Sequence, residues 1–310
     1  MHFHKLDLNL LVALDTLIDE RSVSRAADRL NLSQSAMSSA LSRLRDYFAD
    51  ELLVPVGRRM EPTALALSLA PSVRDILQRI RTTIETRPTF DPGTAQRRFR
   101  IMTSDYLLEV LLAGVIRELA STAPGIQMQI LPASEASFAL FVKGDIDLII
   151  TPEDHTLPEH PRSVLFDDTF SCIVWSENAA VGDPVTLEQY LSMGHVIVHL
   201  GRDQPSILER WFAEESARNN WKPRQVDVIA LNLGVVPHLI VGTRRIATMH
   251  TRHAHLYRRL LPLRVLSPPP GFPSLRETMQ WHRHLDTDPA IRWLVALLHR
   301  FAQATPPQAQ

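Results

Sequence analysis

Residues 22–48, SVSRAADRLNLSQSAMSSALSRLRDYF, decide the fold of the N-terminal part of this chain. Apolar or small residues at positions 23, 26, 27 and 30 have the spacing of a buried helix face. Asn31 and Leu32 interrupt that spacing, and Ser33 is of a residue type that caps the start of a helix. We therefore predict two helices joined by a tight turn, which form a helix-turn-helix at about residues 23–42.

The second of these helices is predicted to have an apolar side and a polar side. Its buried side is expected to contain Ala36, Ala40, Leu41, Leu44 and Phe48. The polar side offers amide, hydroxyl and guanidinium groups, which hydrogen-bond base edges and phosphate oxygens of DNA. The candidate DNA-binding residues are Ser33, Gln34, Ser35, Met37, Ser38, Ser42 and Arg43. The pattern alone leaves open the alternative of an ordinary amphipathic helical hairpin.

The segments on either side complete a small domain. Residues 6–18 predict a further helix, because leucine and isoleucine recur at helical spacing. Residues 52–63 predict a two-stranded wing with Arg58 and Arg59 at its tip, within reach of the phosphate backbone, although a solvated turn is the alternative. Pro55 has no N–H group and indicates an edge strand.

Residues 64–87 are predicted to form a long helix with an exposed apolar stripe. The stripe consists of Val73, Ile76, Leu77, Ile80 and Ile84. An apolar face of this kind is not expected on a helix standing alone in water. Pro71 should start or kink the main segment, because its ring does not fit inside a straight helix.

A hinge at residues 89–96 leads to a region in which strand and helix patterns alternate. The alternation predicts an α/β domain with mostly parallel sheets. Strands are expected at residues 99–102, 126–131, 146–150, 170–175, 196–200, 226–229, 246–249 and 278–282. Helices are expected at residues 106–120, 137–143, 186–191, 205–217, 235–241 and from 288 to about 301. Crossings near Phe170 and Pro268 imply two lobes, each completed by a strand that comes from the other lobe.

Composition suits a globular protein of about two domains. The 310 residues are 45% hydrophobic and 22% charged, with a formal net charge of −1. This balance gives no overall attraction to nucleic acid, so only one small domain is expected to touch DNA. A single cysteine, Cys172, excludes an internal disulfide. We expect a cytoplasmic protein without membrane contact, because no signal peptide and no run of roughly 18 apolar residues is present.

The ends of the predicted strands suggest a ligand site in the cleft between the lobes. Ligands of open α/β sheets bind beyond the carboxyl ends of the strands. The candidate effector-binding residues are Ser104, Thr151, Pro152, Phe170, His199, Asn232 and His250. These residues carry little charge, which favours a neutral or phenolic aromatic over a dicarboxylate, since a dicarboxylate would require arginine. Arg252 would weaken this argument if its side chain turned inward.

Other kinds of site find little support in the sequence. His250, His253 and His255 form H-x2-H-x-H, but this spacing matches no common zinc motif and no cysteine lies nearby. There is no G-x-S-x-G motif, P-loop or dinucleotide fingerprint. We therefore expect no metal, no cofactor and no enzymatic activity.

The chain resembles LysR-type transcriptional regulators. In the N-terminal part the matching residues are 6–11 (LDLNLL), 24–27 (SRAA), 30–36 (LNLSQSA), Ser38, Leu41, 43–44 (RL) and 62–63 (PT). Further matches are residues 97–102 (RRFRIM), 144–148 (GDIDL), 191–196 (LSMGHV) and 245–249 (RIATM). These later motifs look like the branch that includes the flavonoid-sensing nodulation regulators and the salicylate-type aromatic sensors.

The resemblance implies a domain plan and a function. It implies a winged helix-turn-helix at residues 6–63, a linker helix at 64–88 whose apolar stripe pairs two subunits, and an effector-binding domain at 97–303. That domain would be periplasmic-binding-protein-like, with lobe I at 97–169 and 270–303 and lobe II at 170–269. The implied partners are double-stranded promoter DNA, a phenolic or flavonoid-like inducer, a dimer or tetramer of the chain itself, and RNA polymerase for an activator.

Two other classes of protein remain as alternatives. One is a two-lobed solute-binding or substrate-binding enzyme with an N-terminal helical domain. The other is a DNA-bending architectural protein, for which the large α/β domain would be superfluous.

Overall fold

The computed structural model describes residues 7–56, 59–85, 90–199 and 206–304, with the backbone alone for residues 81–85. The chain divides into an N-terminal unit, Met1–Thr86, and a C-terminal unit, Arg87–Gln310. No helix among the described residues is long and apolar enough to cross a membrane.

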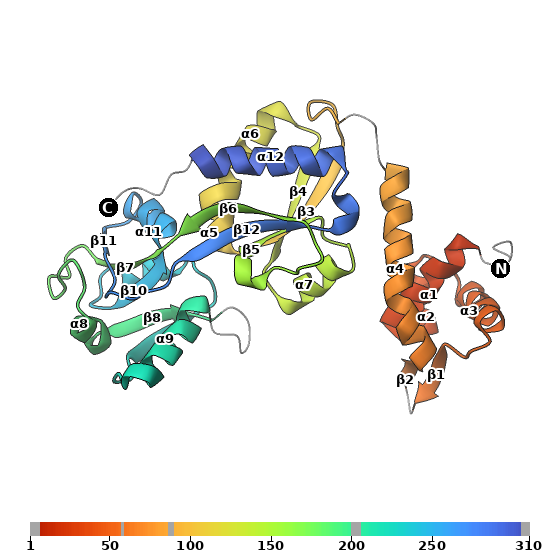
Figure 1. The fold of residues 1–310 in the computed structure, drawn as a ribbon, viewed down its shortest axis with the longest axis horizontal. Helices are drawn as coiled ribbons and strands as arrows, with labels where there is room; N and C mark the ends of the chain where they lie inside the picture. The colour runs from red at the N-terminus through yellow and green to blue at the C-terminus, as the bar shows by residue number, and fades with distance from the viewer. Residues whose placement is uncertain (1–6, 57–58, 86–89, 200–205, 305–310) are drawn as a thin grey trace. The chain divides into compact units, whose positions relative to one another are not determined.

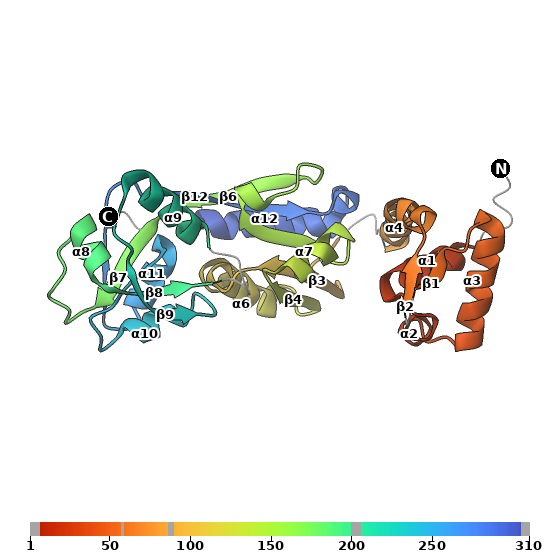
Figure 2. The same ribbon diagram turned by 90° about the horizontal axis from the view of Figure 1, so that it is seen from below.

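The N-terminal unit is a helix-turn-helix with a hairpin and a long helix. Its elements are α1 (Leu8–Glu20), α2 (Val23–Arg29), α3 (Gln34–Phe48), β1 (Leu53–Val56), β2 (Arg59–Pro62) and α4 (Ala64–Glu85). Asn31 makes the turn between α2 and α3 with a φ of 53°, a left-handed conformation that asparagine adopts more readily than most residues. The side chain of Ser33 accepts a hydrogen bond from the backbone N–H of Ala36 at 3.1 Å, so the predicted cap is confirmed. α1 contacts both α3 and α4 (Figure 2).

The buried side of α3 differs from the prediction. Met37 is fully buried with Leu41 and Leu44, whereas Ala36 is exposed. The i, i+4, i+7 spacing of these three apolar residues places Met37 on the core side of the helix. The prediction that Met37 contacts DNA is therefore wrong.

The helix α4 also differs from the prediction. It begins at Ala64, where the Thr63 side chain accepts from the Ala66 N–H, and it runs through Pro71, so Pro71 does not start it. Val73 is 4% exposed in the core of its own unit, and Leu77 packs against that core, so Val73 is not available to a partner. Ile76 remains 43% exposed. The side chain of Ile84 lies outside the described residues, as does Arg58.

The C-terminal unit contains two five-stranded sheets, one in each lobe (Figure 1). The lobe I sheet has the order β4-β3-β5-β12-β6, in which β3 pairs parallel with β4 and β5. Its strands are β3 (Arg97–Thr103), β4 (Ile126–Pro132), β5 (Leu148–Pro152), β6 (Arg162–Asp168) and β12 (Leu275–Trp281). Its helices are α5 (Asp105–Leu107), a π-helical turn (Leu108–Leu112), α6 (Ala113–Thr122), α7 (Glu135–Val142) and α12 (Pro289–Ala304).

Lobe II repeats this arrangement with the strand order β9-β8-β10-β7-β11. Its strands are β7 (Phe170–Trp175), β8 (Gly194–Val198), β9 (Gln225–Ala230), β10 (Ile246–His250) and β11 (Leu263–Leu266). Its helices are α8 (Leu187–Ser192), α9 (Ile207–Asn219), α10 (Val236–Ile240) and α11 (Thr251–Arg258). The chain crosses between the lobes after β6 and again before β12, which confirms the two predicted crossings. Three elements, β6, β11 and α11, have no predicted counterpart in the sequence.

Alternating side chains of each sheet pack on opposite layers of helices. In lobe I, Ile101 and Ile150 face the core beneath α6 and α12, whereas Met102 and Ile149 pack with Phe141 of α7. A single hydrophobic core runs from lobe I into lobe II, where it includes residues of β7, β8, β10, α10 and α11. The two lobes are therefore packed together along one side.

Candidate ligand cavity and DNA-binding face

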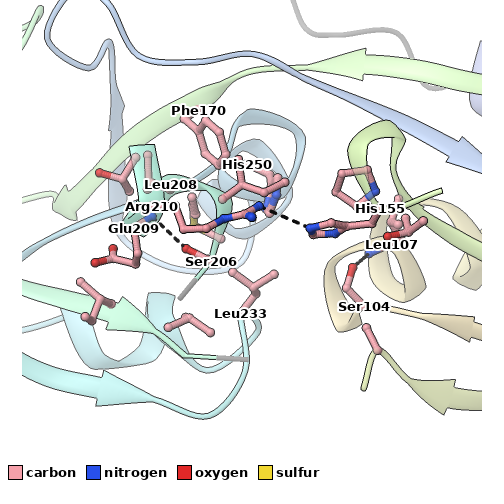
Figure 3. Close-up of a pocket in the computed structure, with 18 of the residues that line it drawn as sticks. Ser104, Leu107, His155, Phe170, Ser206, Leu208, Glu209, Arg210, Leu233 and His250 are labelled. Carbon is pink, nitrogen blue, oxygen red and sulfur yellow. Dashed lines mark hydrogen bonds between the residues drawn. The ribbon is translucent and has the colours of Figure 1, made fainter. Parts of the chain in front are cut away.

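A cavity of about 340 Å³ lies between the two lobes of the C-terminal unit (Figure 3). Its wall includes residues at the carboxyl ends of β3, β5 and β10, the edge at which α/β sheets bind ligands. The volume lies within the range of roughly 300–1,000 Å³ that is common for small-molecule sites. The geometry of the cavity therefore suits an organic ligand of modest size.

Five of the seven predicted effector-binding residues line this cavity. They are Ser104, Thr151, Pro152, Phe170 and His250. His199 and Asn232 do not line it, so their assignment is wrong. The side chain of Asn232 is exposed and accepts from the Val235 N–H at 3.0 Å, where it caps the turn before α10. His199 comes one residue after β8 and is bonded through its backbone N–H to Ala230 at 3.3 Å.

Most of the cavity wall is apolar, and the polar groups are spaced around it. The apolar part includes Leu107, Ile150, Phe170, Val198, Leu208 and Met249. Ser104 accepts from the Leu107 N–H at 3.3 Å and so caps α5. Thr151 on β5 contributes a second hydroxyl group to the wall. An apolar wall with a few hydroxyl groups suits an aromatic ligand that carries hydroxyl substituents.

His250 provides a neutral imidazole at the cavity. Its ring lies flat on the ring of Tyr106, with the centroids 4.0 Å apart and the planes 5° apart. Burial, reinforced by the neighbouring His253, lowers the pKa of His250 to about 3. No group among the described residues hydrogen-bonds its buried Nδ1. A neutral ring nitrogen of this kind accepts from a hydroxyl group or donates to an oxygen, depending on its tautomer.

Arg224 and Glu209 form a buried ion pair in the cavity wall. The Arg224 side chain is 6% exposed and the Glu209 side chain is 13% exposed. Arg224 also donates to the hydroxyl of Tyr190 at 3.2 Å, and its guanidinium lies 4.2 Å from the centre of the Phe212 ring. The charge of Arg224 is thus balanced within lobe II.

Arg210 connects the two lobes across the cavity (Figure 3). It is on the first turn of α9, and its Nη2 lies 3.3 Å from Nε2 of His155 in the short 3₁₀ helix after β5. The same nitrogen lies 3.5 Å from Oδ2 of Asp154. Although no arginine is predicted at a strand end, Arg210 on α9 brings one to the cavity, so the case against an anionic ligand does not hold.

Four residues of the wall are not predicted from the sequence, because they do not lie at the carboxyl end of a strand: Arg210, Arg224, Glu209 and His155. The N-terminal turn of α9 reaches the cavity only through the packing of lobe II, and no local pattern signals this. Arg252 does not line the cavity, because its guanidinium stacks over Phe166 at 4.2 Å from the ring centre.

The remaining titratable candidates do not form a metal or thiol centre. No group of three or more histidine, cysteine or acidic residues in the described part of the chain has the arrangement of a metal site. His253 is buried and paired with Glu109 at 3.1 Å. Burial raises the pKa of the Cys172 thiol to about 12, which disfavours a reactive thiolate.

The outer face of α3 is polar and exposed in the N-terminal unit. Exposed residues on this face and its cap are Ser33, Gln34, Ser35, Ser38, Ser42 and Arg43. Arg45 differs from them, because it donates to the backbone oxygens of Glu51 and Leu53 at 2.8 Å each and so joins α3 to the wing. Arg59 on β2 is exposed. One helix face and a basic wing residue thus offer the hydrogen-bonding groups that DNA requires.

Two family models together match most of the chain. Residues 8–67 match the model described as bacterial regulatory helix-turn-helix protein, lysR family, and residues 92–303 match the LysR substrate binding domain. Nodulation protein D 1 of Bradyrhizobium elkanii is 39% identical over 298 residues, which cover 96% of this chain and 94% of that protein.

Solved structures show the same fold. A probable transcriptional regulator of Pseudomonas aeruginosa is similar with a TM-score of 0.63 and 27% identity, over 96% of this chain and 97% of that one. Full-length CbnR, solved in complex with its target DNA, is similar in fold with a TM-score of 0.53 and 12% identity, over 96% of this chain and 100% of that one.

Proposed function

The chain belongs to the LysR family of bacterial regulatory helix-turn-helix proteins, and we propose that its inducer is a small hydroxylated aromatic molecule that binds between the lobes. As a member of this family the protein is a DNA-binding transcriptional regulator and not an enzyme. The observation that supports the inducer class is the cavity wall, in which hydroxyl groups and the neutral His250 interrupt an otherwise apolar surface. Each such group can pair with a phenolic hydroxyl, while the apolar wall covers the ring.

Calorimetric titration with a panel of phenols, flavonoids, dicarboxylates and amino acids tests the inducer class. We expect phenols or flavonoids to bind wild type, and Thr151→Val to weaken binding severalfold, because one hydrogen bond contributes about 0.5–1.5 kcal/mol. Thr151→Val keeps the shape of the side chain, whereas Ser104→Ala would also remove the cap of α5. Thr122→Val, at an exposed residue of α6 that does not line the cavity, is the matched control. Binding of dicarboxylates or amino acids alone would refute the aromatic proposal.

The recognition residues on DNA are proposed to be Gln34, Ser35, Ser38 and Ser42, with Arg43 and Arg59 on phosphate groups. Their exposure on one helix face and on the wing supports this assignment. In gel shifts with a fragment selected from genomic DNA, Gln34→Ala should lower the preference for that fragment over random DNA. Asp46→Ala, an exposed residue later on α3, is the control. An unchanged preference in Gln34→Ala would remove Gln34 from the set.

The self-association proposed for this chain uses the exposed part of the apolar stripe on α4. Ile76 is exposed and Ile80 is half-buried within the N-terminal unit, so a partner subunit would cover them. Ile76→Glu with Ile80→Glu should produce smaller species in light scattering, whereas Gln78→Glu should not. An unchanged mass would exclude this face as the main contact.

We further propose that the bound inducer promotes transcription with RNA polymerase. A ligand shifts a protein only through its different affinities for two arrangements, and coupling of about 1–3 kcal/mol changes an equilibrium roughly 5–150-fold. A reporter fused to the selected DNA fragment should therefore respond to the inducer in wild type and not in Ala133→Trp, which adds bulk to the cavity wall. Repression by the same inducer would reverse the proposed sign.

A further inference from the structure

The contact between Arg210 and lobe I is positioned to sense a charged ligand. Arg210 belongs to the cavity wall, and so does His155, to which it donates at 3.3 Å (Figure 3). Asp154 lies 3.5 Å from the same nitrogen. Arg210, a cation of lobe II that lines the cavity, is therefore in contact with Asp154, an anion of lobe I that lies just outside the cavity wall.

The contact between Arg210 and Asp154 is more exposed to solvent than the contact between Arg224 and Glu209. The Arg210 side chain is 47% exposed and the Asp154 side chain is 56% exposed, so water and salt screen their attraction. Arg224, by contrast, is buried against Glu209 and Tyr190. Arg210 is therefore the arginine that can exchange its acidic partner for a ligand without leaving a buried charge unpaired.

We propose that Arg210 selects ligands that present an ionised oxygen, either a carboxylate or a phenolate, and that Asp154 takes the place of that oxygen when no ligand is bound. This inference rests on the proposed binding of aromatic molecules in the cavity. A guanidinium binds an ionised oxygen through short, charge-assisted hydrogen bonds, and it binds a carboxylate through two of them at once. The apolar wall beside Arg210, which includes Leu208 and Phe170, covers the aromatic ring of the same ligand.

The two partners of the contact predict effects of opposite sign. Arg210→Gln removes the cation and should weaken the binding of anionic ligands without changing that of neutral ones. Asp154→Asn removes the competing anion and should strengthen the binding of anionic ligands. A side chain that only stabilised the fold would not give opposite signs for its two partners.

The experiment is calorimetric titration of the full chain with matched pairs of probes. The first pair is 3-hydroxybenzoate and 3-hydroxybenzyl alcohol. The second is 4-nitrophenol, above its pKa, and 4-nitrotoluene. We expect wild type to prefer the anion of at least one pair by about tenfold, as a charge-assisted hydrogen bond would give. Preference within the first pair identifies a carboxylate, and preference within the second identifies a phenolate.

The variants decide whether Arg210 causes that preference. Arg210→Gln should abolish it, Arg210→Lys should retain part of it, and Asp154→Asn should increase the affinity for the anion severalfold. A preference that survives Arg210→Gln, or weaker anion binding by Asp154→Asn, overturns the inference. Because both side chains are about half exposed, melting curves of these variants should match wild type and exclude misfolding.

A cavity-filling variant separates this inference from the proposed function. Ala133 is an exposed residue of the cavity wall, so Ala133→Trp should fold and obstruct the site. If Ala133→Trp binds both members of a pair as wild type does, the probes bind elsewhere and the cavity proposal fails. If it loses both members while Arg210→Gln keeps the preference, only the role of Arg210 fails. If wild type binds none of the four probes, this inference is overturned, whereas binding of flavonoids in the earlier panel would still support the proposed function.

Discussion

The proposed DNA-binding face and the candidate ligand cavity are built in opposite ways. The DNA-binding face takes its residues from one helix, α3, and one wing strand, and these side chains point outward. The cavity takes its residues from positions between Ser104 and His250, which two sheets with crossing strands bring together. The first site is therefore encoded by the period of a single helix, and the second by the topology of a whole domain.

The two sites also differ in how far their arginine side chains are exposed to solvent. Arg43 and Arg59 are exposed to solvent, whereas Arg224 is buried and depends on Glu209. An exposed cation can be removed with little effect on folding, but a buried partner left alone retains an unpaired charge. Substitutions at the DNA face should thus change function, and substitution of a buried charge in the cavity wall, such as Arg224, should change stability as well.

The largest effect is expected from Arg224→Met. It leaves the carboxylate of Glu209 buried without its partner, and breaking such a pair typically costs about 3–5 kcal/mol in the free energy of unfolding. Arg210→Met is the matched control, because the exposed contact of Arg210 contributes about 0–1 kcal/mol. Scanning calorimetry measures both. Equal losses in the two variants would contradict the contrast between the buried and the exposed arginine.

The next largest effect is expected from Met37→Ala. It leaves a cavity in the core of the N-terminal unit and should lower the free energy of unfolding by about 2–5 kcal/mol. Its neighbour Ser38 is exposed, so Ser38→Ala should change stability by no more than about 0.5 kcal/mol while weakening specific DNA binding. Calorimetry and gel shifts on both variants separate the two sides of α3. A stable Met37→Ala variant with impaired DNA binding would restore Met37 to the DNA-binding face.

Glu277 on β12 makes stability depend on pH. Burial, with smaller contributions from Asp168 and Asp154, raises the pKa of this carboxyl from 4.5 to about 8. The raised pKa means that the folded chain favours the protonated carboxyl. The contribution of Glu277 to the free energy of unfolding is therefore fully present below pH 4.5 and is lost as the pH rises through about 8. Glu277→Gln should flatten this decline, by on the order of a few kcal/mol. Parallel pH profiles of variant and wild type, in urea titrations, would disprove the assignment.

The smallest effect on stability is expected from Arg43→Ala at the DNA face. The loss of one phosphate contact should weaken binding to specific and random DNA alike, and should reduce the slope of log K against log salt by about one unit. Gel shifts over a range of salt concentrations measure this slope. A change of base preference with an unchanged slope would mean that Arg43 contacts a base.

Local sequence patterns are sufficient to specify most of the individual helices and strands. Helical periodicity and the residue types at Asn31 and Ser33 were sufficient to predict the helix-turn-helix, because these patterns act within a few neighbouring residues. The same local reasoning predicted the wing and most strands of the two lobes. The same reasoning assigned Met37 to the wrong side of α3, because consecutive residues of a helix can lie on its buried side and on its exposed side.

Which residues share the cavity depends on long-range packing, and no local pattern specifies it. Every candidate at a strand end had the same local signal, yet Thr151 and His250 line the cavity while His199 and Asn232 do not. The strand β6, which the sequence does not predict, forms the edge of the lobe I sheet next to β12. Only two of its seven residues are buried, so its sequence shows no clear alternation of apolar and polar residues. Contacts between distant segments depend on how sheets and helices pack, and a short-range pattern carries no information about that packing.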